Sequence, residues 1–209
     1  HKGQTNLLKS YYLPHSLGIF YGAITQFLGF MQHDEEWKVM GWAPYGKNLF
    51  SDKLSKIINI EKHELNLKYF QCHKGLFPWY TEELTKLLAI KPRDNKSDFS
   101  PIYADLAASA QDILESCILK LAKESKELSG LNKLAMAGGV ALNGKANGNI
   151  LKESIFEDLF VTPASADDGS AVGAALWVAE KNGFKVDKNF KTRNIYLGKS
   201  YSIKSCSEA

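Results

Sequence analysis

The chain has 209 residues, of which 44% are hydrophobic and 23% charged, the balance of a globular protein with a real core. The net charge of +3 includes no Lys/Arg block, which argues against a nucleic-acid partner. No apolar run reaches the roughly 18 residues of a membrane span, so we expect no membrane partner either. Three scattered cysteines favour a reducing compartment and hence the cytoplasm. The start at His1, without a methionine, predicts a piece of a longer protein.

The N-terminal part opens with an extended stretch, 5–8, which we interpret as the end of a strand. Apolar residues at helical spacing through 14–32 then predict a helix with one buried face, ending near Gly29. Ser16 is suited to cap that helix. For His15, beside the cap, capping or core packing is favoured over a catalytic role.

A polar turn leads to Lys38 and then to a cluster of glycine, proline and aromatic residues at 41–46. This cluster predicts irregular backbone beyond Pro44. Lys38 has two interpretations. It is either a solvated lysine or an ammonium group that faces the phosphate of a nucleotide.

Residues 47–99 carry no chemical motif. Their patterns predict a short helix at 53–60, a strand at 65–70 and a helix at 81–88. His63 and His73 belong to no metal-ligand pattern, and we expect both to be exposed.

The longest predicted helix has Pro101 at its first position and ends at Ser129-Gly130. Beyond it, short apolar runs alternate with helical segments. The order is a strand at 131–137, a Gly138-Gly139 turn, a helix to Lys152, a strand at 157–162, an Asp167-Asp168-Gly169 turn and a small-residue helix at 171–180. We expect both strands to be neighbours in one sheet, buried between helices 101–128 and 167–181.

The two turns are the candidate site, because open α/β sheets bind ligands at the carboxyl ends of their strands. The Gly138-Gly139 backbone suits close approach by a phosphate, although taken alone it favours a tight turn without a ligand. Asn143 either caps the next helix or hydrogen-bonds a ribose or base. Asp167 and Asp168 exceed what capping requires, and one of them suits a metal ion or its water.

Four motifs, in this order, resemble the signatures of the O-carbamoyltransferases, the family of the nodulation-factor and antibiotic carbamoyltransferases. They are Pro14-His15-Ser16-Leu17-Gly18, Trp37 to Gly46, Ala137 to Asn143, and Pro163 to Ala175. The stretch Asn194 to Gly198 also resembles the family's exit from this domain.

The resemblance implies an α/β fold of the actin/sugar-kinase-like (ribonuclease H-like) class, of which this chain would be a partial domain with an insertion. Residues 1–46 would start the second lobe and 47–99 would be a variable insertion. Residues 100–198 would form the nucleotide- and metal-binding core, and 199–209 would begin a linker to a downstream domain.

In this family, carbamoyl-adenylate is made from ATP and carbamoyl phosphate by a downstream module. The actin-like module, related to the threonylcarbamoyl transferase that modifies tRNA, passes the carbamoyl group to a hydroxyl of a small-molecule or sugar acceptor. A divalent metal ion, of Fe or Mg type, would be held by two first-lobe histidines and Asp167. Asp168 would orient a metal-bound water or act as a partner of the ligands. The residues implied for nucleotide binding are Lys38, Gly138, Gly139, Asn143 and Gly169.

Because the first lobe and the downstream module are missing from residues 1–209, we expect the chain to be inactive by itself. Two alternatives stay open. One is a sugar-kinase-like lobe, in which the glycine turn binds ADP and Asp167 holds Mg²⁺. The other is a non-catalytic nucleotide-binding module. Homodimer formation is also left open.

Overall fold

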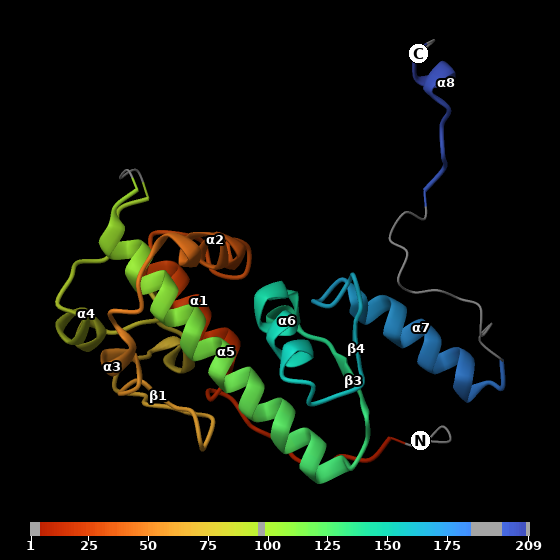
Figure 1. The fold of residues 1–209 in the computed structure, drawn as a ribbon, viewed down its shortest axis with the longest axis horizontal. Coiled ribbons are helices and arrows are strands. Elements are labelled where there is room, and N and C mark those ends of the chain that lie inside the picture. The colour runs from red at the N-terminus through yellow and green to blue at the C-terminus, as the bar shows by residue number, and fades with distance from the viewer. Residues whose placement is uncertain (1–4, 96–98, 185–197, 208–209) are drawn as a thin grey trace.

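The computed structural model describes residues 5–95, 99–184 and 198–207. Helices α1 to α5 precede the parallel strand pair β3–β4, and α6 to α8 are interleaved with or follow it (Figure 1). The elements are α1 (Leu17–Phe27), α2 (Glu36–Trp42), η1 (Ala43–Tyr45), α3 (Ser51–Leu54), β1 (Ile58–Asn59), β2 (Glu64–Leu65), η2 (Cys72–Lys74), α4 (Glu82–Leu88), α5 (Pro101–Ser129), β3 (Lys133–Met136), η3 (Gly139–Leu142), α6 (Gly144–Lys152), β4 (Asp158–Val161), α7 (Gly169–Lys181) and α8 (Ile203–Ser207).

The elements α1 to α5, residues 17–129, form the helical half of the molecule. Helix α1 begins as predicted, since Ser16 Oγ accepts the N–H of Gly18 at 3.1 Å. The chain leaves it at Gly29, whose φ of 78° suits a residue without a Cβ. Phe20, Ile24 and Phe27 recur at helical spacing and are fully buried.

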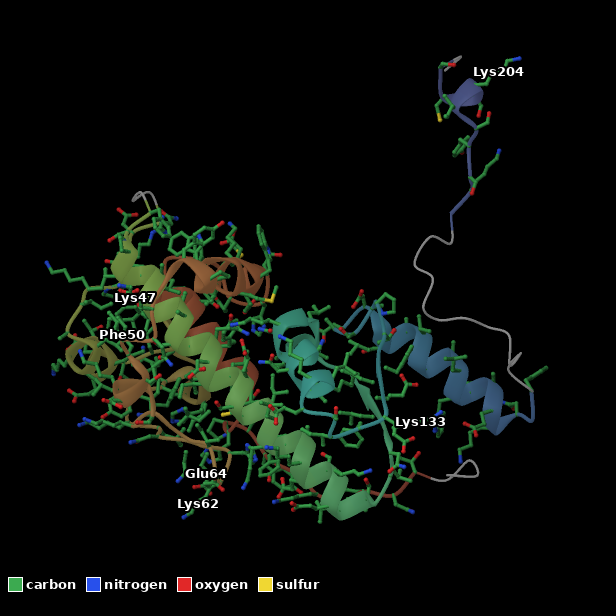
Figure 2. All side chains as sticks on the ribbon, viewed as in Figure 1. Lys47, Phe50, Lys62, Glu64, Lys133 and Lys204 are labelled. Atoms are coloured by element: carbon green, nitrogen blue, oxygen red, sulfur yellow. The ribbon has the colours of Figure 1, made fainter. Side chains whose placement is uncertain are left out.

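The core of the helical half is shared by α1, α5 and the segment 47–99. Large side chains from that segment join those of α1 and α5 in one cluster, among them Phe50, Leu54, Ile57, Phe70, Leu84 and Leu88. Figure 2 shows the side chains crowded around Phe50 beside α5. The segment is therefore an integral part of this core.

Helix α5 has the predicted bounds. Pro101 stands at its first position, and Gly130, with φ of 65°, ends it in the left-handed region. It packs on α1, α2 and α3, and the same helix also packs on α6. It therefore joins the helical half to the rest of the chain.

The elements β3 to α7, residues 133–181, form the site half. Strands β3 and β4 are parallel neighbours with Leu134 opposite Leu159, which confirms their predicted pairing. Their predicted burial is wrong, because the residues of both strands are half-buried or exposed. Among the described residues the pair has no third strand, so part of each strand stays open to solvent.

Helix α7 follows the second turn and extends away from α5 (Figure 1). None of its residues is buried, and Trp177 is 61% exposed. The prediction that this helix covers a face of the sheet is therefore wrong for the described residues. Helix α6 instead packs on α5 through Ala146 and Ile150, both fully buried.

Several smaller predictions are corrected. Residues 5–8 form no strand, because they pair with no neighbouring strand among the described residues. The helix expected at 53–60 is replaced by α3 and the short antiparallel pair β1–β2. The strand expected at 65–70 is reduced to β2 and one bridge between Phe70 and Tyr80.

The described residues thus form a mixed α/β structure with two small sheets. The actin/sugar-kinase-like class stays a prediction. Within the described part of the chain, no helix combines the length and the apolar character needed to cross a membrane. The predicted exit segment, from Asn194 to Leu197, lies outside the described residues.

Candidate functional site

A cavity of about 1420 Å³ lies where the helical half meets the site half. One wall comes from the turns that follow β3 and β4. The other comes from the start of α1, from α2 and from the loop that contains η2. Five of the predicted site residues line this single cavity: Gly138, Gly139, Asn143, Asp167 and Asp168.

The glycine turn is held open toward the cavity. Gly138 has φ of 95°, a conformation that residues with a side chain rarely adopt. Its N–H donates to the carbonyl of Ser165 at 2.6 Å, and this bond ties the turn after β3 to the turn after β4. An added Cβ on Gly139 would meet nothing within 4 Å. The turn therefore offers bare backbone beside open space.

The acidic turn places two exposed carboxylates on the same wall. Asp168 occupies the N-cap position of α7, but its side chain makes no capping hydrogen bond. Asp167 precedes it and is also exposed. Gly169 is not part of the lining. Its hydrogen atom faces Ala164, and an added Cβ would overlap the Ala164 carbonyl oxygen. Gly169 thus shapes the turn without reaching the cavity.

Asn143 lines the cavity, yet its amide is committed to the protein. Its Oδ1 accepts the N–H of Ala146 at 3.0 Å, so the predicted cap of α6 is confirmed. The same oxygen accepts from Gln111 Nε2 at 3.0 Å, and Asn143 Nδ2 donates to Gln111 Oε1 at 3.0 Å. Hydrogen bonding to a ribose or base would have to compete with these contacts.

These bonds belong to a buried network that joins α1, α5 and α6. The Tyr21 hydroxyl donates to Gln111 Oε1 at 2.7 Å, and Gln111 Nε2 donates to Glu115 Oε1 at 2.7 Å. Glu115 also binds Lys145 Nζ at 3.0 Å. Burial raises the pKa of Tyr21 far above its ordinary value, so its hydroxyl keeps its proton and stays a donor. The network fixes the glycine turn relative to α1 and α5.

Lys38 lies outside the cavity lining. Its ammonium forms an ion pair with Glu35, and this hydrogen bond lowers the pKa of the Glu35 carboxyl. The side chains of Glu36, Trp37 and Met40 line the cavity in its place. The structure therefore does not bring Lys38 to the glycine turn.

The aromatic wall of the cavity was missed by the sequence reasoning. It consists of His33, Trp37, Met40, His73 and Trp79, together with Asp34 and Glu36. The ring of His33 meets that of Trp79 edge-on, with centroids 4.8 Å apart. The sequence signal for part of this wall was the aromatic, glycine and proline residues in 37–46 and 77–80. The first run was interpreted as a family motif with irregular backbone beyond Pro44, and the second was given no role in the site.

The other histidines have structural positions. His15 Nδ1 accepts the N–H of Leu65 at 3.0 Å, in line with the packing role favoured for it. The prediction that His63 is exposed is wrong, because the residue is only 5% exposed and its ring meets that of Tyr11 edge-on. His73 is exposed as predicted.

The chemistry of the donors bears on the metal ion implied by the resemblance. Carboxylate oxygens at Asp167 and Asp168 suit a hard cation. Among the described residues, however, no group of three His, Cys, Asp or Glu side chains could hold a metal ion. The described residues therefore do not fit a complete metal site.

Comparison with known proteins identifies a matching family model and several similar proteins. A family model described as carbamoyltransferase N-terminus matches residues 1–176. Nodulation protein NolNO of Sinorhizobium fredii is 33% identical over 190 residues, which are 88% of this chain and 25% of that protein. Nodulation protein NolO of Bradyrhizobium diazoefficiens is 33% identical over 171 residues, 80% of this chain and 29% of that protein. The uncharacterized protein sll1178 of Synechocystis is 37% identical over 183 residues, 84% of this chain and 30% of that protein. The chain thus spans about a quarter to a third of the length of these relatives.

Proposed function

The chain belongs to the carbamoyltransferase N-terminus family, and from this premise we propose that it is the carbamoyl-transferring part of a longer enzyme. In this proposal the donor is carbamoyl-adenylate, made from ATP and carbamoyl phosphate elsewhere in the complete protein. The acceptor is a hydroxyl compound. The lobe is actin-like, and the cavity between its two halves is the place of transfer.

One observation carries this proposal. The turn after β3 and the turn after β4 line the same cavity and are joined by the bond from Gly138 N–H to the Ser165 carbonyl. The glycine turn offers backbone for close approach by the adenylate phosphate, and the acidic turn offers Asp167 and Asp168 beside it. The proposed transfer needs both in one place, because the glycine turn would hold the donor and a carboxylate would take the proton of the acceptor hydroxyl.

The reaction is an acyl transfer. The acceptor hydroxyl oxygen bonds to the carbamoyl carbon, the bond from that carbon to the phosphate oxygen breaks, and AMP leaves with the bonding electrons. The hydroxyl proton must pass to a base, and an exposed carboxylate at Asp168 is suited to hold or direct that proton. The Gly138-Gly139 backbone would hold the phosphate side of the donor.

A divalent cation belongs to this proposal, with Asp167 as one of its ligands. A bound cation would polarise the carbamoyl carbonyl. Catalytic metal sites need about three protein ligands, and the described residues offer too few, so we assign no step to the metal. We expect the 209-residue chain to bind metal weakly or not at all.

The test compares Asp167→Ala with Asp168→Ala in the complete protein, by metal content and by a carbamoylation assay. We expect Asp167→Ala to remove both metal and transfer, and Asp168→Ala to lower transfer while leaving more of the metal bound. Full metal occupancy and full activity in the Asp167 variant would contradict the proposal.

A further inference from the structure

The aromatic wall includes an exposed indole ring at the cavity. Trp37 lines the cavity and is 63% exposed, which is unusual for so large an apolar side chain next to a concave surface. Met40, one helical turn further along α2, lines the cavity with it. This part of the cavity is therefore suited to contact a ligand that offers either an apolar surface or a cation to an aromatic ring.

Trp79 is fixed in this wall from three sides. Its backbone N–H donates to Gln26 Oε1 at 2.6 Å. Its ring lies against α1 at Gly22, where an added Cβ would be 2.9 Å from the ring atom Cζ3. His33 meets the ring edge-on. The absence of a side chain at Gly22 makes room for the ring. These three contacts hold Trp79 in place without a ligand.

The charges on the cavity lining have one sign. Four carboxylates line it, from Asp34, Glu36, Asp167 and Asp168, and no lysine or arginine does so among the residues that the structure describes. Two of the four, Asp34 and Glu36, belong to the aromatic wall. Glu36 is held there because its Oε1 accepts the N–H of His33 at 2.6 Å.

The Trp37 ring already has a cation beside it. Lys38 Nζ lies 5.5 Å from the ring centroid while paired with Glu35. A second ammonium group on the cavity side would find the same ring and two further carboxylates. An indole ring next to carboxylates is the combination by which proteins recognise ammonium groups.

We propose that the aromatic wall, built by residues 33–40 and 72–79, binds the ammonium group of an amine-bearing alcohol, which is the acceptor of the carbamoyl group. The proposal rests on the proposed function, since it names the class of acceptor for the same cavity. The ammonium lies against Trp37 and Trp79 with Asp34 and Glu36 as counter-charges. The hydroxyl of the same molecule then faces the glycine and acidic turns.

The test uses two probes of equal shape. Choline carries a hydroxyl and a quaternary ammonium, and 3,3-dimethylbutan-1-ol replaces that nitrogen with carbon and has no charge. Both are titrated into the complete protein by calorimetry. We expect choline to bind at least about tenfold more tightly than the neutral alcohol, a ratio typical of a desolvated cation–π contact.

Two variants at the aromatic wall and one control locate the binding. Trp37→Leu should weaken choline binding about tenfold and leave the binding of the neutral alcohol nearly unchanged. Trp177→Leu is the matched control, because Trp177 is 61% exposed on α7, lies outside the cavity lining and should not change choline binding. Asp34→Asn should also weaken choline, since it removes one of the counter-charges.

Equal binding of the two probes, or equal loss in the Trp37 and Trp177 variants, would overturn the inference. Preferred binding of the neutral alcohol would indicate an apolar acceptor and would overturn it as well. An ADP titration of the same samples separates this failure from that of the proposed function. Loss of choline recognition with intact ADP binding refutes only the acceptor class, whereas absence of ADP binding refutes the proposed function itself.

Discussion

The helical half and the site half of the molecule differ in how they use their apolar residues. In the helical half, Phe20, Ile24 and Phe27 are fully buried in a core that segment 47–99 completes. In the site half, β3 and β4 are at most half-buried and α7 buries nothing. The helical half therefore carries the stability, while the site half presents its turns to the cavity. Changes in the buried core of the helical half should act on folding, whereas changes at the cavity-lining turns of the site half should act on binding.

The largest expected effect tests the helical half. Phe27→Ala should lower the free energy of unfolding by about 3–5 kcal/mol, because it removes a fully buried ring that packs edge-on against Tyr80. Trp177→Ala removes a larger ring from α7 and should change stability by less than about 0.5 kcal/mol. Urea unfolding of both variants is the measurement. Equal losses would mean that α7 is as well packed as α1 and would remove the contrast between the halves.

Changes in the buried hydrogen-bond network around Gln111, which connects the two halves, should lower both stability and nucleotide binding. Gln111→Leu removes the hydrogen-bond acceptor of the buried Tyr21 hydroxyl and of Asn143 Nδ2. Glu115, in contrast, keeps Lys145 as a partner. Each buried group left unpaired costs about 1–3 kcal/mol. The variant should also weaken ADP binding in the complete protein, because the glycine turn loses its support.

Ser109→Ala is the control for the Gln111 variant. Ser109 is buried on the same helix, but its Oγ accepts the N–H of Phe50, away from the cavity. This variant should lose stability and keep its ADP affinity. If the Gln111 variant also keeps that affinity, the network is only structural.

Within the site half, alanine substitutions at two glycines of α7 should have opposite effects on stability. Gly169→Ala should cost about 1–3 kcal/mol, because its Cβ would overlap the Ala164 carbonyl. Gly173→Ala meets nothing within 4 Å and should stabilise by roughly 0.5–1 kcal/mol, as alanine does in a helix. Thermal unfolding of both variants checks this. A neutral Gly169→Ala would show that the acidic turn relaxes freely.

The smallest expected effect is a pH dependence in the helical half. Burial lowers the pKa of His63 below its ordinary value of 6.5, so the unfolded chain binds the proton more readily than the folded one. This contribution to stability is therefore fully present above about pH 6.5 and is lost as the pH falls below it. His63→Asn, which tolerates the positive φ of 54°, should flatten that decline. Urea midpoints at about pH 7.5 and about pH 5.5 measure it, and an equally steep decline in the variant would exclude His63 as its source.

The sequence predicted features that depend on neighbouring residues. Ser16 caps α1, Pro101 and Gly130 bound α5, and the apolar runs before the two turns pair as β3 and β4. Each follows from local backbone chemistry or from a short apolar pattern. The meeting of both turns in one cavity followed from the rule that parallel strands end at the same edge.

Features that arise between distant segments were beyond reach. The edge-on contact of His33 with Trp79 joins residues far apart in the chain, and so does the edge-on contact of the buried His63 with Tyr11. The sequence of helix α7 is rich in small residues and has no clear apolar face. Such a sequence fits a packed helix and an exposed one equally well. Lys38 lay in a motif that fitted a phosphate, but the nearby Glu35 takes its ammonium. Such outcomes depend on tertiary contacts that periodicity does not encode.

The central claim is that the bare backbone of the glycine turn receives a nucleotide. It is tested most directly by calorimetric titration of ADP into the complete protein carrying Gly139→Val, with Gly144→Ala as the control. Both positions have open space around an added Cβ, so both variants should fold, but only Gly139 lines the cavity. We predict that the valine fills the space needed for the phosphate and abolishes measurable ADP binding, while Gly144→Ala binds like the wild type. Unchanged ADP affinity in the Gly139→Val protein would contradict the account.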